Sequence, residues 1–152
     1  RETLRRIRAD HYDDCEGIEL VEGAYGYTAV RPRDDTDVAK ITFRDCIMTQ
    51  ANELFRLCFK SERGCKIEVL IDGERAATFE GDTMSYVAHV DFRENSIREG
   101  TPMPERWPAL YIEWKKQLPE NCRKAGEHVN IEFRLTGDVK LIYWYMEKET
   151  TR

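Results

Sequence analysis

The chain has 152 residues, of which 35% are charged and 41% are hydrophobic, and its formal net charge is -5. A chain of this length can bury one self-sufficient core, and its apolar content excludes a disordered protein. Because the net charge is negative and Lys and Arg are interleaved with Asp and Glu, we expect no nucleic-acid partner.

The chain contains no run of about 20 apolar residues that could span a membrane, and no apolar signal core follows its basic start. We therefore expect no membrane association. The first residue is Arg1 and not Met, so we interpret the chain as an excised domain. Residues 1–6 are expected to be a linker or domain boundary, and residues 7–148 a single domain.

Short alternating runs, each closed by a turn signal, follow one another along the chain. The first two runs, 37–44 and 53–60, are each expected to turn one set of alternate side chains to the core. Those sets are Ala39, Ile41 and Phe43 in the first run and Phe55, Leu57 and Phe59 in the second.

A turn at 61–64 leads into the run 65–71, and we expect these strands to form a hairpin with 53–60. Asp72-Gly73 then predicts a tight hairpin with the return strand 73–80. Three more strands are expected at 85–92, 128–135 and 139–147.

Residues 93–125 break this pattern with several prolines and form an expected loop or helix insertion. Two interpretations of 109–118 stay open: a helix would align Leu110, Trp114 and Leu118, and a strand would align Leu110, Ile112 and Trp114. With about eight strands and at most one short helix in the insertion, the fold class is all-β, a jelly-roll β-sandwich.

The five cysteines are odd in number and include no Cys-x-x-Cys pair, so a zinc site is not expected. Cys58 and Cys65 would lie opposite each other in a symmetric hairpin and could approach disulfide distance. The odd count favours buried free thiols instead and indicates a reducing compartment or an anaerobic source.

The order of five motifs resembles the family 6 carbohydrate-binding modules and the related families 35 and 36. The motifs are IRADHY (7–12), DVAKITFRD (37–45), KIEVLIDGE (66–74), AGEHVNIEFRLTG (125–137) and LIYWYME (141–147). The resemblance implies a galactose-binding-like jelly roll that binds an oligo- or polysaccharide without catalysing a reaction. It also implies attachment to the catalytic domain of a glycoside hydrolase, and a secreted or cell-surface location.

The family holds a structural calcium with two Glu of its opening strand and an Asp of its closing strand. The corresponding positions here are Arg8, Asp10, and Tyr143 or Ile142. Asp10 keeps a carboxylate and is the candidate metal ligand, but a cation at a ligand position repels calcium. No other cofactor is expected.

The family's sugar cleft uses an aromatic residue, a Trp and an Asn at positions that carry Val38, Met84 or Tyr86, and Lys140 here. Aromatic side chains elsewhere add candidates in an early loop, in the insertion and on the closing strand, and each has an alternative interpretation as a packing residue. The expected carbohydrate-binding residues are Tyr27, Tyr86, Trp107, Lys140 and Tyr143.

The sequence contains no nucleophile elbow, phosphate loop or Ser-His-Asp signature, so no catalytic residue is expected. Two hypotheses follow. The chain is a carbohydrate-binding module that targets an attached glycoside hydrolase to a glycan, or it is an accessory β-sandwich without a sugar site that packs against neighbouring domains.

Overall fold

The alternating runs form two antiparallel sheets in the computed structural model, which describes residues 6–48, 53–83, 110–122 and 127–148. This part of the chain contains eleven strands and two short 3-10 helices. The strands are β1 (Ile7–Arg8), β2 (Asp14–Glu16), β3 (Ile18–Glu22), β4 (Thr28–Pro32), β5 (Ala39–Met48), β6 (Leu54–Lys60), β7 (Cys65–Ile71), β8 (Glu74–Gly81), β9 (Ile112–Gln117), β10 (Glu127–Gly137) and β11 (Lys140–Glu147). The helices are η1 (Ala9–His11) and η2 (Glu120–Cys122). No helix in the described ranges is long and apolar enough to cross a membrane.

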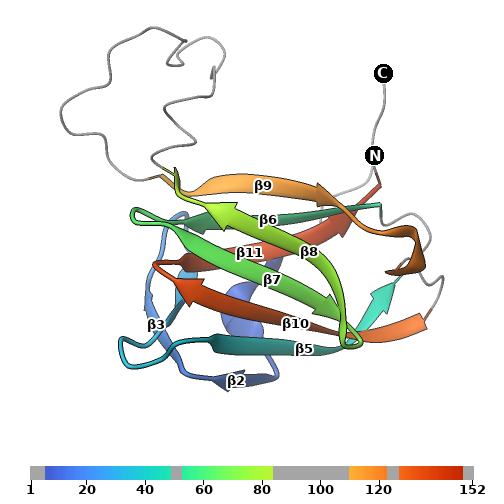
Figure 1. Ribbon diagram of the computed structural model, residues 1–152, viewed down its shortest axis with the longest axis horizontal. Coiled ribbons are helices and arrows are strands. Elements are labelled where there is room, and N and C mark those ends of the chain that lie inside the picture. Colours follow the sequence, from blue (N-terminus) through green and yellow to red (C-terminus); the bar gives the residue numbers. More distant parts are fainter. Residues whose placement is uncertain (1–5, 49–52, 84–109, 123–126, 149–152) are drawn as a thin grey trace, which may run out of the picture.

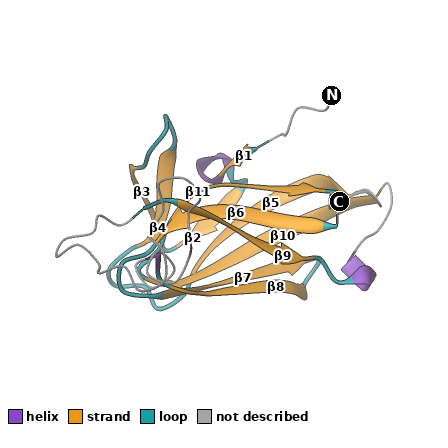
Figure 2. Cartoon of the chain, turned by 90° about the horizontal axis from the view of Figure 1, so that it is seen from above, coloured by secondary structure: helices purple, strands orange, loops and turns teal. Residues whose placement is uncertain are grey.

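The two sheets pack face to face as a sandwich. Sheet A has the order β3-β4-β11-β6-β9, with β1 added beside β11, and sheet B has the order β2-β5-β10-β7-β8. Sheet B lies in front in Figure 1, and Figure 2 shows the two layers from above. This architecture confirms the predicted all-β sandwich. The described strands outnumber the eight or so expected from the sequence, because β1 and β2 are only two and three residues long and β3 and β4 do not alternate strictly between apolar and polar residues.

The predicted inward faces of the strands form the core between the sheets. The alternate sets expected from 37–44 and 53–60 are buried, and so are Cys65, Ile67, Val69 and Ile71 of β7. An aromatic cluster lies at the centre, where Trp144 has its ring 5.2 Å from Phe43, 5.4 Å from Phe55 and 5.4 Å from Phe133. Such ring pairs contribute about 0.5–1.5 kcal/mol each beyond the area that they bury.

A bulge in β11 decides which side chains of the closing strand face outward. Leu141 pairs with Phe59 and Tyr143 pairs with Cys58, so β11 carries one extra residue, Ile142. Leu141 and the aromatic Trp144 therefore point into the core. Ile142, Tyr143 and Tyr145 instead pack together on the outer face of sheet A.

The turn at 61–64 crosses from one sheet to the other, so the expected hairpin of 53–60 with 65–71 is wrong. β6 belongs to sheet A and β7 to sheet B. The crossing is held from both sides: Asp138 accepts hydrogen bonds from the backbone N–H groups of Glu62 (2.9 Å) and Arg63 (3.1 Å). Thr83 donates its N–H to the carbonyl of Ser61 at 2.8 Å.

The crossing also separates the two cysteines that the hairpin would have paired. Cys58 lies on the outer face of sheet A and Cys65 in the core between the sheets. Both are buried free thiols, and Cys15 and Cys46 are free as well. Burial raises the pKa of Cys58 to about 12 and that of Cys65 to about 11.

Of the two interpretations left open for 109–118, a helix or a strand, the strand is confirmed. β9 pairs with β6, with Ile112 opposite Phe59 and Trp114 opposite Leu57. Trp114 stacks on Phe59 with the ring centroids 5.4 Å apart. The expected strand at 85–92, and most of the insertion at 93–125, lie outside the described residues.

The tight hairpin predicted at Asp72-Gly73 is confirmed between β7 and β8. Both residues have positive φ angles, 49° and 85°. This backbone conformation is the one that a two-residue type I′ turn requires.

Candidate functional site

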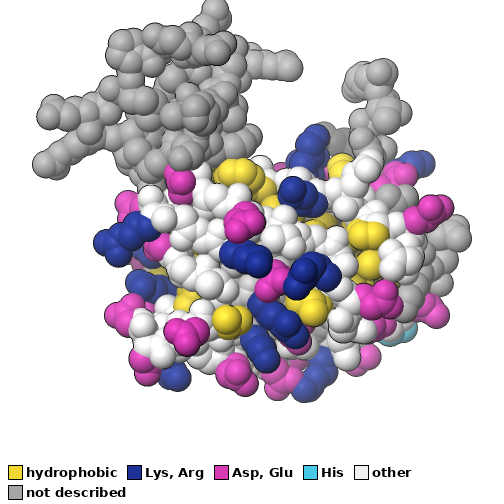
Figure 3. Space-filling model, in the orientation of Figure 1, with side chains coloured by type: hydrophobic (Ala, Val, Ile, Leu, Met, Phe, Trp, Pro, Cys, Tyr) yellow, Lys and Arg dark blue, Asp and Glu magenta, His cyan; other side chains and the backbone are white. Residues whose placement is uncertain are grey.

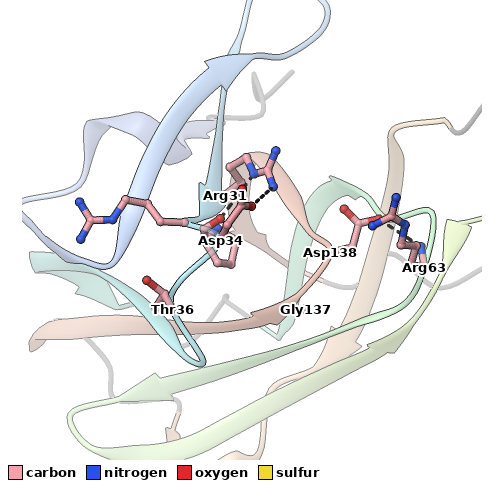
Figure 4. Close-up of a pocket in the computed structure, with 8 residues that line it drawn as sticks. Arg31, Asp34, Thr36, Arg63, Gly137 and Asp138 are labelled. Carbon is pink, nitrogen blue, oxygen red and sulfur yellow. Dashed lines mark hydrogen bonds and ion pairs between the residues drawn. The ribbon is translucent and has the colours of Figure 1, made fainter.

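Three turns meet at one end of the sandwich and line an open cavity of about 260 Å³. They are the β4–β5 connection and the two sheet-crossing turns after β6 and β10. Figure 4 shows Arg31, Asp34 and Thr36 on one side of the cavity, and Asp138 and Arg63 on the other. The remaining lining residues are Pro32, Arg33 and Gly137. All eight come from the ends of strands or from turns, where the backbone leaves the sheet and side chains can converge.

Arg31 is fixed at the rim by carboxylates on both sides. Its guanidinium lies 3.5 Å from the carboxylate of Glu19 and 3.2 Å from that of Asp34. Because the Asp34 side chain is 95% exposed, solvent screens this ion pair and it adds little to stability. Its effect is to orient the guanidinium, whose planar set of donors suits hydroxyl and carboxylate oxygens.

The opposite rim is held by backbone hydrogen bonds. Asp138 accepts the two N–H groups of the 61–64 turn, and its own N–H donates to the carbonyl of Gly64 at 3.2 Å. Gly137 has a φ angle of 88°, and a Cβ atom there would lie 2.9 Å from the same carbonyl oxygen. The two sheet-crossing turns therefore fit against each other only with glycine at this position.

Two of the predicted sugar-binding residues meet on the outer face of sheet A, and a third belongs to the same strand as one of them. Tyr27, just before β4, has its ring 5.2 Å from that of Tyr143 on β11, and Lys140 begins the same strand. Tyr143 is only 5% exposed, and the Arg6 guanidinium lies 4.6 Å from its ring centroid. The ring is therefore a covered surface, while the half-buried Lys140 lies two residues beyond Asp138 at the cavity.

A carboxylate organises the tyrosines of this face. Glu113 on β9 accepts a hydrogen bond from Tyr145 at 2.9 Å, another from Tyr143, and a third from Arg56 at 3.3 Å. Burial, and next the hydrogen bond to Glu113, raise the pKa of Tyr145 to about 12. The pKa of Tyr143 is raised for the same two reasons. Both phenols are therefore neutral hydrogen-bond donors at physiological pH.

The residues at the family's calcium positions lie together, and they do not fit calcium. Arg8 pairs with Tyr143 in the β1–β11 register, and its Nε atom lies 3.1 Å from the Asp10 carboxylate. The same guanidinium lies 5.2 Å from the ring centroid of Tyr27. The Arg8 guanidinium thus pairs with the Asp10 carboxylate, which calcium would need as a ligand. Within the described ranges, no group of three or more His, Cys, Asp or Glu could hold a metal ion.

Tyr86 and Trp107, the two other predicted sugar-binding residues, lie outside the described residues. Val38, at the position of the family's cleft aromatic, is 42% exposed beside the cavity-lining turn. Sequence reasoning missed Arg31, Arg63 and Asp138. The run Arg-Pro-Arg-Asp-Asp at 31–35, where a strand ends, was the signal for the first of these. No local signal marks the other two, because a sheet-crossing turn resembles a hairpin turn in sequence.

No family model and no curated protein matches the sequence. Solved structures do match it over nearly its full length. One is the module CsCBM6-3 from Clostridium stercorarium in complex with cellobiose, with a TM-score of 0.65 and 12% identity over 96% of this chain and 95% of that chain. A family 6 carbohydrate-binding module from Clostridium cellulolyticum in complex with xylose gives 0.64 and 15% over 95% and 98%.

A third match is a carbohydrate-binding module of lichenase 5A from Cellvibrio mixtus in complex with cellotriose. Its TM-score is 0.59 and its identity 13%, over 98% of this chain and 100% of that chain. A fourth is a family 43 arabinoxylan arabinofuranohydrolase from Bacillus subtilis, of which this chain covers only 27%. The chain therefore has the fold of the family 6 carbohydrate-binding modules, as the order of its motifs predicts.

Proposed function

We propose that the chain is a non-catalytic carbohydrate-binding module and that it binds a glycan at the loop-end cavity. One observation carries this proposal: the cavity is lined by Arg31, Asp34, Thr36, Arg63 and Asp138. Its volume of about 260 Å³ lies just below the roughly 300–1,000 Å³ of drug-sized ligand sites. A sugar of one or two units presents hydroxyls that can form directional hydrogen bonds with such donors and acceptors.

One side of the cavity is held by backbone contacts. Asp138 accepts hydrogen bonds from two N–H groups of the 61–64 turn, which fixes the position of Arg63 at the rim. A preorganised site loses less conformational entropy on binding than a flexible one. Tyr86 and Trp107 are our candidates for stacking on the sugar ring, since aromatic faces suit its C–H face.

In this proposal the module belongs to a longer glycoside hydrolase. It holds the neighbouring catalytic domain close to an insoluble or dilute polysaccharide. Binding of the catalytic domain to the same polysaccharide then becomes effectively intramolecular. A polysaccharide target implies that the protein works outside the cell.

The accessory packing domain is the second candidate. Val38 replaces the family's cleft aromatic and is exposed, and the ring of Tyr143 is covered. If the cavity binds no sugar, the lack of an aromatic residue at Val38 and the covered ring of Tyr143 favour a module that packs against a neighbouring domain.

Calorimetric titration with a panel of plant, algal and host glycans tests the proposal, with and without calcium. The informative variant is Arg63→Ala, because Arg63 contributes only its backbone N–H to the structure of the rim. Lys66→Ala, on the exposed face of β7, is the matched control. We expect saturable binding that calcium does not change, weakened in Arg63→Ala and kept in Lys66→Ala. No binding to any glycan of the panel would favour the accessory packing domain.

A further inference from the structure

A row of basic side chains crosses sheet A next to the cavity. Lys140 on β11 lies directly opposite Lys60 on β6. Leu141 lies opposite Val30, which places Arg31 of β4 beside Lys140 on its other side. Leu141 and Val30 point into the core, so their chain neighbours Lys140 and Arg31 point outward. We name Arg31, Lys140 and Lys60 the basic row.

The members of the basic row differ in their negative partners. Arg31 pairs with Glu19 and Asp34. Among the described residues, no carboxylate forms an ion pair with Lys60 or Lys140. Lys60 instead places its ammonium 5.4 Å from the ring centroid of Tyr111. All three side chains of the row are half-buried, and like charges directly opposite on neighbouring strands destabilise a sheet.

On the outer face of sheet B, three arginines meet carboxylates. Arg75 lies 2.6 Å from Glu68 and Arg134 2.6 Å from Glu132, although Arg134 also lies opposite Lys40. Arg44 pairs in the same way with Asp14. Figure 3 shows this face, where Lys and Arg side chains alternate with those of Asp and Glu. Within the described ranges, Lys60 and Lys140 differ from these three arginines in having no carboxylate partner.

Arg63 adds a further positive charge at the rim of the cavity. Its backbone N–H binds Asp138, and its exposed guanidinium has no ion-pair partner among the described residues. Arg31 belongs to both the basic row and the cavity lining. A ligand in the cavity would therefore meet one guanidinium on each side, and Arg31 connects the cavity with the basic row.

We propose that the basic row and Arg63 bind the negatively charged groups of an acidic glycan. This inference rests on the proposed function and adds the class of ligand. Carboxylate and sulfate share the required chemistry, since both accept charge-assisted hydrogen bonds from ammonium and guanidinium groups. Such a group would also relieve the repulsion between Lys140 and Lys60.

Paired ligands test the inference. Oligomers of polygalacturonate are compared with the same oligomers fully methyl-esterified, and a sulfated galactan with its desulfated form, each by calorimetric titration at low and high salt. The double variant Lys60→Gln/Lys140→Gln is measured beside Lys66→Gln, whose residue lies opposite Glu80 on sheet B. Circular dichroism confirms that each variant is folded.

We expect a charged member of one pair to bind about tenfold more tightly than its neutral partner, with a preference that falls as salt rises. The double variant should lose this preference and Lys66→Gln should keep it. Preference for polygalacturonate identifies carboxylate as the bound group, and preference for the sulfated galactan identifies sulfate. Equal affinity within both pairs overturns the inference and leaves glycan binding intact. Binding to none of these ligands, nor to any glycan of the panel, overturns both.

Discussion

Glu113 on β9 accepts the phenol hydrogen bond of Tyr145 on β11 at 2.9 Å, across the intervening strand β6. The same carboxylate accepts a hydrogen bond from Tyr143 and pairs with Arg56 at 3.3 Å. One side chain therefore ties three strands of sheet A together on its outer face.

Glu113→Ala should lower the free energy of unfolding by about 1–3 kcal/mol, because it leaves two largely buried phenol hydroxyls without their acceptor. Urea denaturation followed by circular dichroism measures this loss. Glu120→Ala, at an exposed position of η2, is the control and should change stability by less than about 0.5 kcal/mol. Similar losses in the two variants would show that the cluster does not stabilise the sheet.

Lys140→Glu should stabilise the protein. The new carboxylate would lie opposite Lys60 and beside Arg31, so it turns a repulsive cross-strand pair into an attractive one of about 0.2–1 kcal/mol. Lys66→Glu should do the reverse, because Lys66 lies opposite Glu80. Thermal unfolding at low salt detects both changes. A destabilised Lys140→Glu variant would contradict the arrangement of the basic row.

Stability should fall in alkaline solution. The pKa of Tyr145 is raised to about 12 by burial and by its bond to Glu113, whereas an unfolded tyrosine titrates near pH 10. The folded state therefore binds the phenol proton of Tyr145 more tightly than the unfolded state does. The resulting contribution to the free energy of unfolding is complete below about pH 10 and is lost as the pH rises toward about 12. Chemical denaturation between pH 8 and 12 should show a shallower decline for Tyr145→Phe. An unchanged slope in that variant would exclude Tyr145 as a cause.

Gly137→Ala should cost more stability than Gly73→Ala. Both glycines have similar positive φ angles, 88° and 85°, so both substitutions carry the backbone cost of about 1 kcal/mol. Only at Gly137 would the new Cβ also lie 2.9 Å from a backbone oxygen, that of Gly64, while at Gly73 it meets open space. Urea titration of the two variants gives the difference. Equal losses would mean that the two sheet-crossing turns can move apart freely.

Local patterns predicted the strands that carry the core. Phe55, Leu57 and Phe59 are spaced two apart, and a half-buried strand turns such residues to one side. Asp72-Gly73 likewise predicted its hairpin because that dipeptide accepts the two positive φ angles of the turn.

The remaining features depend on contacts that a local pattern does not contain. The turn at 61–64 crosses between sheets because Asp138, more than 70 residues later, binds its N–H groups. The bulge at Ile142 turns Tyr143 outward, and this register is set by pairing with β6. Arg31, Arg63 and Asp138 meet only after both turns have formed, so the sequence could not place the cavity.

Glycan binding at the loop-end cavity is the central claim, and amide chemical shifts test it most directly. A uniformly ¹⁵N-labelled sample is titrated with the tightest-binding oligosaccharide of the panel while amide spectra are recorded. Among the described residues, we expect the largest shift changes at Thr36, Arg63, Gly137 and Asp138, with little change on the outer face of sheet B. Changes centred on the outer face of sheet B, or none with any glycan, would contradict the claim.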